Sequence, residues 1–443
     1  MKASNYNFFY TYEANNNKMI AYNAYSNTLA LVDKDKHDMY SDFADKGECI
    51  PDEGFAKQLA QTNFIIEDSA NELDRLRLRM FKSRYRSDML GLAIAVTADC
   101  NFRCPYCFER VVIRPEYMSK NVEDAVLKYV KNYSRTIRNL NIYWYGGEPL
   151  LALDVLERLS RCFIEICDKN NINYNAKIVT NGYLLSRETI RLLGEIKVSS
   201  IQMTIDGNKE KHDSLRHLAD GSGTYDTIMN NLVDNVDILP EVSMRLNVSK
   251  DNIAFIKDIV QILKDKGLDG KVTPYVERIK SDNDEYGDVQ CFGMQSFSKE
   301  LLDHYEESSN NGNNSYFFPR RIENYCAADC LNNMVIDASG KIYKCVKEVG
   351  KPDRHVGHVE PTACTEPPNL QLLSDYLLYD PTLDPQCSKC DALPICMGGC
   401  PLQRVSDDKD KCGKYKYILD GLLKIAARKL RGTFPPFRYM IRG

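Results

Sequence analysis

The pattern of apolar and polar positions divides the chain of 443 residues into three parts. The first 85 residues combine strand-like aromatic stretches with turns and two helix-like stretches at 52–61 and 71–85. Residues 88–275 alternate apolar runs with amphipathic segments. Residues 326–412 are dense in Cys, Pro and Gly, and they show little helical periodicity. Each part therefore predicts a different kind of structure.

The middle part predicts six strand–helix units in series. The expected strands are 91–97, 141–145, 176–180, 200–206, 242–248 and 270–277. The expected helices are 120–134, 153–169, 186–195, 224–238 and 253–266. Such alternation favours parallel strands with right-handed crossovers, in either a partial barrel or a doubly wound sheet. In both folds the chemistry gathers at the carboxyl ends of the strands.

The chain is too long for one compact core, so more than one domain is expected. We divide it into a small α+β module at 1–85, an α/β core at 86–310 and a Cys-rich domain at 311–443. The first module is equally compatible with a simple cap on the core. Residues 278–325 are polar and turn-rich and suit a bridge or substrate-facing loops. A terminal helix is expected in "YILDGLLKIAARKL".

Composition excludes several classes of function. The net charge of −4 gives no general footprint for nucleic acid. The first residues lack the apolar core of a signal peptide, and no stretch of about 18 apolar residues could span a membrane. We therefore expect a cytoplasmic protein that binds neither nucleic acid nor membrane.

The 16 cysteines are clustered, and in a reducing compartment clustered cysteines indicate metal. Cys100, Cys104 and Cys107 follow the first expected strand of the core. Three thiolates suit zinc or an iron–sulfur cluster. A structural zinc site requires a fourth protein ligand, whereas a [4Fe–4S] cluster with three cysteines leaves one iron open to a small molecule.

The stretch "CNFRCPYC" resembles the radical SAM superfamily. The resemblance implies that the open iron binds S-adenosylmethionine, which is cleaved to a 5′-deoxyadenosyl radical that abstracts hydrogen from substrate. It also implies that Cys100, Cys104 and Cys107 hold the cluster and that Tyr106 lines the adenine pocket. The fold we expect is α/β, a partial (β/α)6 TIM-type barrel with the small N-terminal α+β module and a C-terminal Cys-rich iron–sulfur domain.

Further motifs occur in the order that the same family predicts. "YGGEP" matches the family's GGEP, which binds the methionyl ammonium, and supplies Gly146, Gly147, Glu148 and Pro149. Polar residues at or just past later strands match positions that contact the ribose and carboxylate: Thr180, Asn181, Thr204, Asp206, Arg216 and Asn247. A single Thr or Asn at a strand end is more often a helix cap, so the prediction rests on the order and spacing of all these residues around the three cysteines.

The downstream cysteines are similar in spacing to the SPASM domain of peptide-modifying radical SAM enzymes, although zinc ribbons also use CxxC pairs. The resemblance implies two auxiliary [4Fe–4S] clusters, hence three in all. The first would be held by Cys326, Cys330, Cys345 and Cys400, and the second by Cys387, Cys390, Cys396 and Cys412. If Cys326 does not ligate, an iron of the first auxiliary cluster is open to substrate. We expect Cys49, Cys162, Cys167, Cys291 and Cys364 to be ordinary apolar positions.

The resemblance also implies a reaction on peptides. Formylglycine-forming relatives carry an aspartate directly after the cysteine matching Cys345, whereas this chain has Val346. We therefore expect thioether crosslinks in a ribosomal precursor peptide, whose leader adds a strand to the module at 1–85, with flavodoxin or ferredoxin as reductant. The alternatives are a formylglycine-generating sulfatase maturase, a carbon–carbon crosslinking enzyme and, remotely, a non-catalytic metal-binding scaffold.

Overall fold

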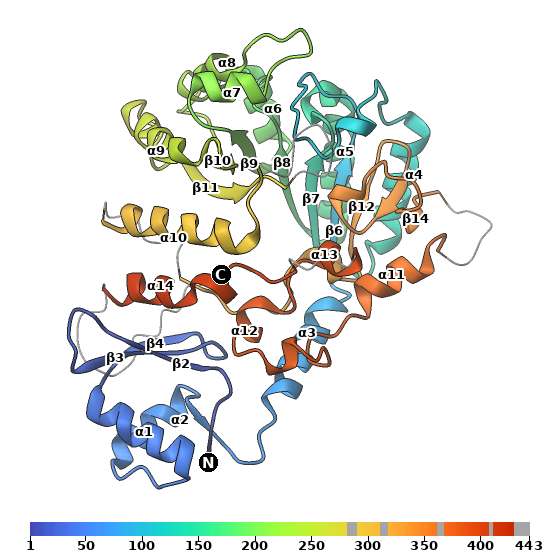
Figure 1. Cartoon of the computed structure of the whole chain (residues 1–443). Coiled ribbons are helices and arrows are strands. Elements are labelled where there is room, and N and C mark those ends of the chain that lie inside the picture. The colour runs from blue at the N-terminus through green and yellow to red at the C-terminus, as the bar shows by residue number, and fades with distance from the viewer. Residues whose placement is uncertain (281–289, 311–317, 361–366, 407–410, 429–443) are drawn as a thin grey trace. The chain divides into compact units, whose positions relative to one another are not determined.

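The computed structural model describes residues 1–280, 290–310, 318–360, 367–406 and 411–428 (Figure 1). It divides into two compact units. The first joins residues 1–84, 293–327 and 378–443, and the second joins 85–292 and 328–377. The division predicted from the sequence, at 1–85, 86–310 and 311–443, refers to functional modules and not to compact units. It stays a prediction.

The second unit is built on a nine-stranded sheet in the order β11-β10-β9-β8-β7-β6-β12-β13-β14. Its six parallel strands are β6 (Met89–Ala95), β7 (Asn139–Tyr145), β8 (Asn173–Val179), β9 (Val198–Ile205), β10 (Glu241–Val248) and β11 (Val272–Arg278). Each pairs in parallel with its sequence neighbours, and the pairing of β8 with β9 shifts in register between Ala176 and Lys177. The α/β class and the partial TIM-type barrel are thus confirmed, and the doubly wound alternative is set aside.

Helices connect these strands and cover one side of the sheet (Figure 1). They are α4 (Lys120–Tyr133), α5 (Leu153–Asn170), α6 (Arg187–Glu195), α7 (Lys209–Leu215), α8 (Tyr225–Val233) and α9 (Ile256–Asp265). Burial alternates along β10, where Val242, Met244 and Leu246 are buried while Arg245 and Asn247 are half-buried. Because successive side chains point to opposite faces, the polar ones line the face opposite the apolar core.

Part of the Cys-rich region extends this sheet, which the sequence did not reveal. β12 (Asn333–Ile336) pairs in parallel with β6, and β13 (Lys341–Tyr343) and β14 (Gly357–His358) continue antiparallel. α11 (Leu370–Leu377) follows. These strands are very short, so periodicity over so few residues gave no signal. This part of the region shares the main hydrogen-bonded framework and does not depend on metal alone.

The first unit contains the three-stranded antiparallel sheet β2-β3-β4. Its elements are β1 (Lys2–Ala3), β2 (Asn7–Thr11), β3 (Lys18–Asn23), β4 (Thr28–Asp33), α1 (Lys34–Lys46), α2 (Glu53–Gln61), β5 (Ile65–Ile66), α3 (Glu72–Arg84), α10 (Met294–Asn310), α12 (Leu393–Cys396), α13 (Pro401–Val405) and α14 (Tyr415–Ala427). The predicted strands and helices of the module are present. The expected terminal helix is α14, and its last predicted residues lie outside the described ranges.

One apolar core joins distant parts of this unit. Tyr22 and Met80 from the N-terminal module pack in the same cluster as Leu393 and Leu423 from the C-terminal segment. Cys387, Cys390 and other half-buried side chains pack against it. The N-terminal module therefore shares a core with the cysteine-bearing segment. Among the described residues, no helix combines the length and the apolar character needed to cross a bilayer.

Candidate active site

The loop after β6 carries the three clustered thiols. Cys104 is buried, and Cys100 and Cys107 are half-buried. Phe102, 1% exposed, anchors the loop, and its backbone N–H donates to Cys100 Sγ over 3.4 Å. Burial raises the pKa of all three thiols, with smaller contributions from neighbouring acidic groups and from one another. Such thiols become thiolates when a metal cation supplies compensating charge.

Among the residues that the structure describes, no three His, Cys, Asp or Glu side chains stand close enough to hold one metal ion. In an iron–sulfur cube each thiolate binds a different iron, so its ligands stand farther apart than those of one ion. The three thiols nevertheless share one short loop at the carboxyl end of β6.

A buried polar network gathers residues from four separate segments. The Tyr106 hydroxyl donates to Asp206 Oδ2, Arg216 Nη1 donates to Tyr106 Oη at 2.9 Å, and Asn247 Nδ2 approaches the same oxygen at 3.4 Å. Burial raises the pKa of Asp206, although Arg216 opposes the effect. Four predicted site residues therefore meet at one point, at the ends of β9 and β10. Thr204 lies in β9, two residues before Asp206.

Two atoms of this network fit an absent polar ligand. Within the described residues, Asp206 Oδ1 and Arg216 Nε are buried without a hydrogen-bond partner. Buried polar atoms are rarely left unpaired, and such exceptions indicate a missing partner. A carboxylate could accept from hydroxyls such as those of a ribose, and the guanidinium could donate to a carboxylate. The residues present therefore fit S-adenosylmethionine.

Glu148 ties together the ends of β7 and β8. Its fully buried carboxylate accepts from Thr180 Oγ1 at 2.7 Å, from the Asn181 backbone N–H at 2.7 Å and from the Leu150 backbone N–H at 3.1 Å. Burial raises its pKa, and these hydrogen bonds oppose the rise. An ionised carboxylate has about four lone-pair sites, so one remains for an ammonium group. Pro149 opens the following short helix.

The two glycines of this motif serve backbone packing. Gly146 has φ +134°, and a Cβ on it would lie 2.4 Å from the Thr97 carbonyl oxygen. A Cβ on Gly147 would lie 2.2 Å from the Asp99 carbonyl oxygen. The Glu148 N–H donates to that same Asp99 oxygen at 2.8 Å. Both glycines therefore let the end of β7 approach the cysteine loop. Their predicted contact with S-adenosylmethionine stays a prediction.

Sequence reasoning missed the residue that orients this network. His212, in α7, accepts from the Asp206 backbone N–H at Nδ1 over 3.3 Å, so its proton sits on Nε2, 3.1 Å from Thr224 Oγ1. The Thr224 hydroxyl in turn donates to the Arg216 carbonyl. His212 lies four residues before the predicted Arg216, but its partners become visible only in three dimensions. Arg245 was also missed, and its Nε donates to Asn247 Oδ1 at 2.6 Å.

The predicted auxiliary ligands fall into two groups. Cys387, Cys390, Cys396 and Cys412 all belong to the first unit. Tyr379 Oη lies 3.7 Å from Cys387 Sγ, and Lys416 Nζ donates to Cys412 Sγ over 3.6 Å. Burial raises the pKa of Cys387 to about 11, although the Tyr379 hydroxyl opposes the rise. This set therefore comes together within one compact unit.

The other predicted set is divided between the units. Cys330 and Cys345 belong to the second unit, where Lys344 Nζ donates to the carbonyl oxygen of Cys330 at 2.7 Å. Cys326, which is exposed, and Cys400 belong to the first. This ligand set remains a prediction. Of the other cysteines, Cys167 is buried, Cys162 and Cys291 are half-buried and Cys49 is exposed, whereas Cys364 lies outside the described residues.

Comparisons with known proteins identify a radical SAM domain and similar folds. The model of the radical SAM superfamily matches residues 94–284. A cysteine-type anaerobic sulfatase-maturating enzyme of Clostridium novyi is 23% identical over 69% of this chain and 85% of its own. The radical SAM cyclopropyl synthase TigE of Paramaledivibacter caminithermalis is 26% identical over 46% of this chain and 44% of its own.

Two solved structures share the fold. The sulfatase-maturating enzyme anSMEcpe with bound AdoMet and Cp18Cys peptide superposes with a TM-score of 0.59 at 20% identity, covering 77% of this chain and 99% of its own. SuiB of Streptococcus suis superposes with a TM-score of 0.53 at 15% identity, covering 93% and 98%. The chain therefore contains a radical SAM domain at residues 94–284, and this domain implies a [4Fe–4S] cluster and S-adenosylmethionine.

Proposed function

We propose that this enzyme forms thioether crosslinks in a ribosomally made precursor peptide, from a cysteine sulfur to a carbon of another residue. When bound, the cluster and S-adenosylmethionine supply a 5′-deoxyadenosyl radical, which removes a hydrogen atom from a substrate carbon. Each bridge removes two hydrogens from the peptide in all: one would pass to the radical as a hydrogen atom, and the other would leave as the thiol proton together with one electron, which an auxiliary iron–sulfur cluster would accept. Flavodoxin or ferredoxin is the proposed electron donor.

The proposal rests on the N-terminal module at residues 1–85. The likeness to SuiB extends over 93% of this chain, compared with 77% for anSMEcpe, and another SuiB structure is bound to the precursor peptide SuiA. In the described part of the module, the edge strands β2 and β4 pair only with β3 within their sheet. An extended leader peptide could add to such an edge through backbone hydrogen bonds.

Val346 favours crosslinking over formylglycine formation. It packs at the margin of an apolar cluster that contains Val335, Tyr343 and Val349. A valine there cannot accept a proton, whereas relatives expected to form formylglycine have an aspartate at this position. The sulfatase-maturase reaction is kept as the alternative, because sulfatase-maturating enzymes are among the relatives.

The chain's own residues would hold the reactants as follows. Cys100, Cys104 and Cys107 are the proposed ligands of the cluster. Glu148 would accept from the methionyl ammonium, and the network of Tyr106, Asp206, Arg216 and Asn247 would hold the ribose and carboxylate. The two auxiliary clusters, on the cysteines named above, remain part of the proposal.

The test uses a short Cys-bearing peptide encoded beside this gene, co-expressed with the enzyme without oxygen. A thioether lowers the peptide mass by two hydrogens per bridge and consumes one thiol, as alkylation with iodoacetamide would show. A carbon–carbon link gives the same mass but leaves the thiol free. Formylglycine from cysteine loses the sulfur. The proposal is wrong if the product retains every alkylatable thiol or has lost sulfur.

A further inference from the structure

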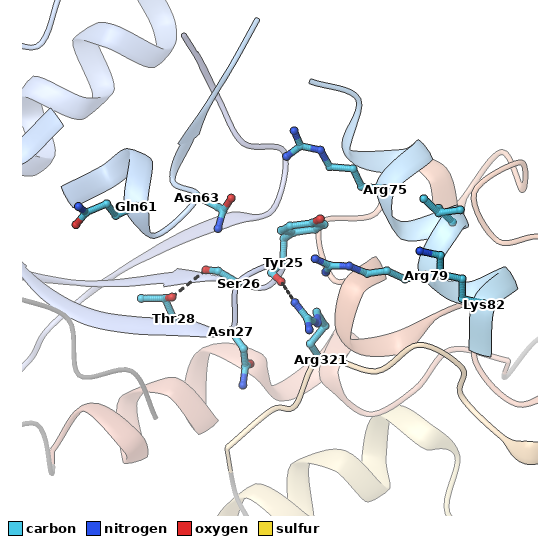
Figure 2. A pocket seen from close by; sticks show the side chains of 11 residues that line it. Tyr25, Ser26, Asn27, Thr28, Gln61, Asn63, Arg75, Arg79, Lys82 and Arg321 are labelled. Carbon is cyan, nitrogen blue, oxygen red and sulfur yellow. Dashed lines mark hydrogen bonds between the residues drawn. The ribbon is translucent and has the colours of Figure 1, made fainter. Parts of the chain in front are cut away.

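A cavity of about 620 Å³ lies in the first unit (Figure 2). It is bordered by the turn between β3 and β4, by the end of α2 and by one face of α3. Its lining residues are Tyr25, Ser26, Asn27, Thr28, Gln61, Asn63, Arg75, Leu78, Arg79, Lys82 and Arg321. This volume lies within the range of ligand-binding pockets. The cavity also adjoins Thr28, the first residue of edge strand β4.

The lining is cationic and lacks carboxylates. Arg75, Arg79, Lys82 and Arg321 contribute four positive charges, and no Asp or Glu lines the cavity. Across the described ranges, none of the four forms an ion pair. This contrasts with Arg77 on the same helix, whose Nε lies 2.6 Å from Asp380 Oδ2. The side chains that line the pocket therefore carry a net positive charge, which favours the binding of an anion.

Two of the cations are held in place around one tyrosine. The guanidinium of Arg79 lies over the Tyr25 ring, 4.7 Å from its centroid, and Arg321 Nη1 donates to the Tyr25 carbonyl at 3.2 Å (Figure 2). Within the described structure, Arg79 Nη1 is buried without a hydrogen-bond partner. Burial and the nearby charge of Arg79 lower the pKa of Arg321. A negatively charged ligand would accept a hydrogen bond from Arg79 Nη1, and it would also reduce the repulsion between Arg79 and Arg321.

The spacing of the cations favours an extended peptide over a single phosphate group. Arg75, Arg79 and Lys82 lie on one face of α3, and a helix rises 1.5 Å per residue, so they span about 10 Å. Arg75 and Arg79 are about 6 Å apart along the axis. Side chains on one face of an extended chain recur about every 6.5–7 Å. Leu78, 57% exposed between these cations, offers apolar contact as well.

We propose that this pocket binds acidic side chains of the precursor peptide, with Asp or Glu at alternate positions of an extended segment. The inference rests on the proposed function, because it takes a precursor peptide as the partner. It adds the chemistry by which the peptide is recognised. If a precursor peptide paired with edge strand β4, an acidic segment of that peptide would reach the cavity at Thr28.

The test measures the binding of fluorescein-labelled synthetic peptides to the full-length protein by fluorescence anisotropy. One peptide has Glu alternating with Ser, and its control has Gln in place of each Glu. The pocket variant is Arg75→Gln with Arg79→Gln. The matched control is Lys57→Gln, an exposed position on α2 outside the pocket. Arg79→Lys keeps the positive charge. Binding by this variant would show that a substitution at this position does not abolish binding by unfolding the protein.

We expect the Glu peptide to bind and the Gln peptide to bind at least about tenfold more weakly, the effect of roughly 1.4 kcal/mol. The double variant should lose about tenfold in affinity, whereas Lys57→Gln and Arg79→Lys should lose little. Added salt should weaken binding. Equal binding of both peptides, an unaffected double variant, or tighter binding of inorganic pyrophosphate than of the Glu peptide would overturn the inference.

The same preparations separate this inference from the proposed function. If they release 5′-deoxyadenosine and crosslink their peptide while the double variant binds and turns over normally, only the pocket assignment fails. If the pocket binds the Glu peptide but no thioether ever forms, only the proposed reaction fails.

Discussion

Acidification should destabilise the second unit through His212. This side chain is fully buried, and burial, aided by Arg216, lowers its pKa to about 3. An unfolded histidine titrates near 6.5. Because the unfolded chain then binds more protons than the folded chain, stability is complete above about pH 6.5 and falls as the pH drops toward 3.

The magnitude at pH 5 depends almost entirely on the unfolded chain, since the folded histidine is still neutral there. A difference of about 1.5 pH units at 1.36 kcal/mol per unit gives about 2 kcal/mol. For a unit of this size, that corresponds to a fall in Tm of roughly 4–8 °C. Protonation would also place an N–H at Nδ1 against the Asp206 N–H and so disturb the network.

The assay compares thermal unfolding of the wild type and His212→Gln at pH 7 and pH 5, without oxygen. Glutamine does not titrate, and its amide can still accept from one side and donate to the other. Other acid-sensitive groups are common to both proteins. We predict that the wild type loses about 2 kcal/mol more than the variant between the two pH values. Equal losses would refute the reasoning.

Three other substitutions probe the site and the cores. Gly147→Ala should displace the cysteine loop, since its Cβ would meet the Asp99 carbonyl, and we expect lower iron content per protein with an otherwise folded circular dichroism spectrum. Normal iron loading would contradict this. Thr180→Val should cost about 1–3 kcal/mol, because it removes a donor from buried Glu148; calorimetry would measure it, and an unchanged Tm would count against it. Leu422→Ala, at a fully buried position of α14, should cost about 2–5 kcal/mol in denaturant unfolding, and a cost within measurement error would show that the site repacks.

The apolar runs predicted the barrel strands well because each strand has 7 or 8 residues, and burial alternates along most of β9 and β10. They did not predict α1, because only Tyr40 of its 13 residues is buried, and the helix has almost no apolar face to detect. The pairing of β12 with β6 joins segments far apart in sequence, and such pairing leaves no local signal. These failures share a physical cause, since tertiary contacts stabilise elements whose own sequences are nearly neutral.

Motif spacing predicted the residues of the candidate site, but it did not show how these residues contact one another. Tyr106 and Asp206 were both predicted to contact the ligand, but their hydrogen bond across 100 residues was visible only in the fold. The roles of Gly146 and Gly147 in packing against the cysteine loop were hidden for the same reason. His212 lies four residues before the predicted Arg216, yet only its three-dimensional partners show its role in positioning the network.

We propose that the three thiols of the loop after β6 hold a cluster that cleaves S-adenosylmethionine. The direct measurement is 5′-deoxyadenosine release by anaerobically reconstituted protein with dithionite, by chromatography and mass spectrometry, beside the Cys104→Ala variant. We predict release by the wild type and none above background by the variant. Equal release by both, or none from a fully iron-loaded wild type, would contradict the account.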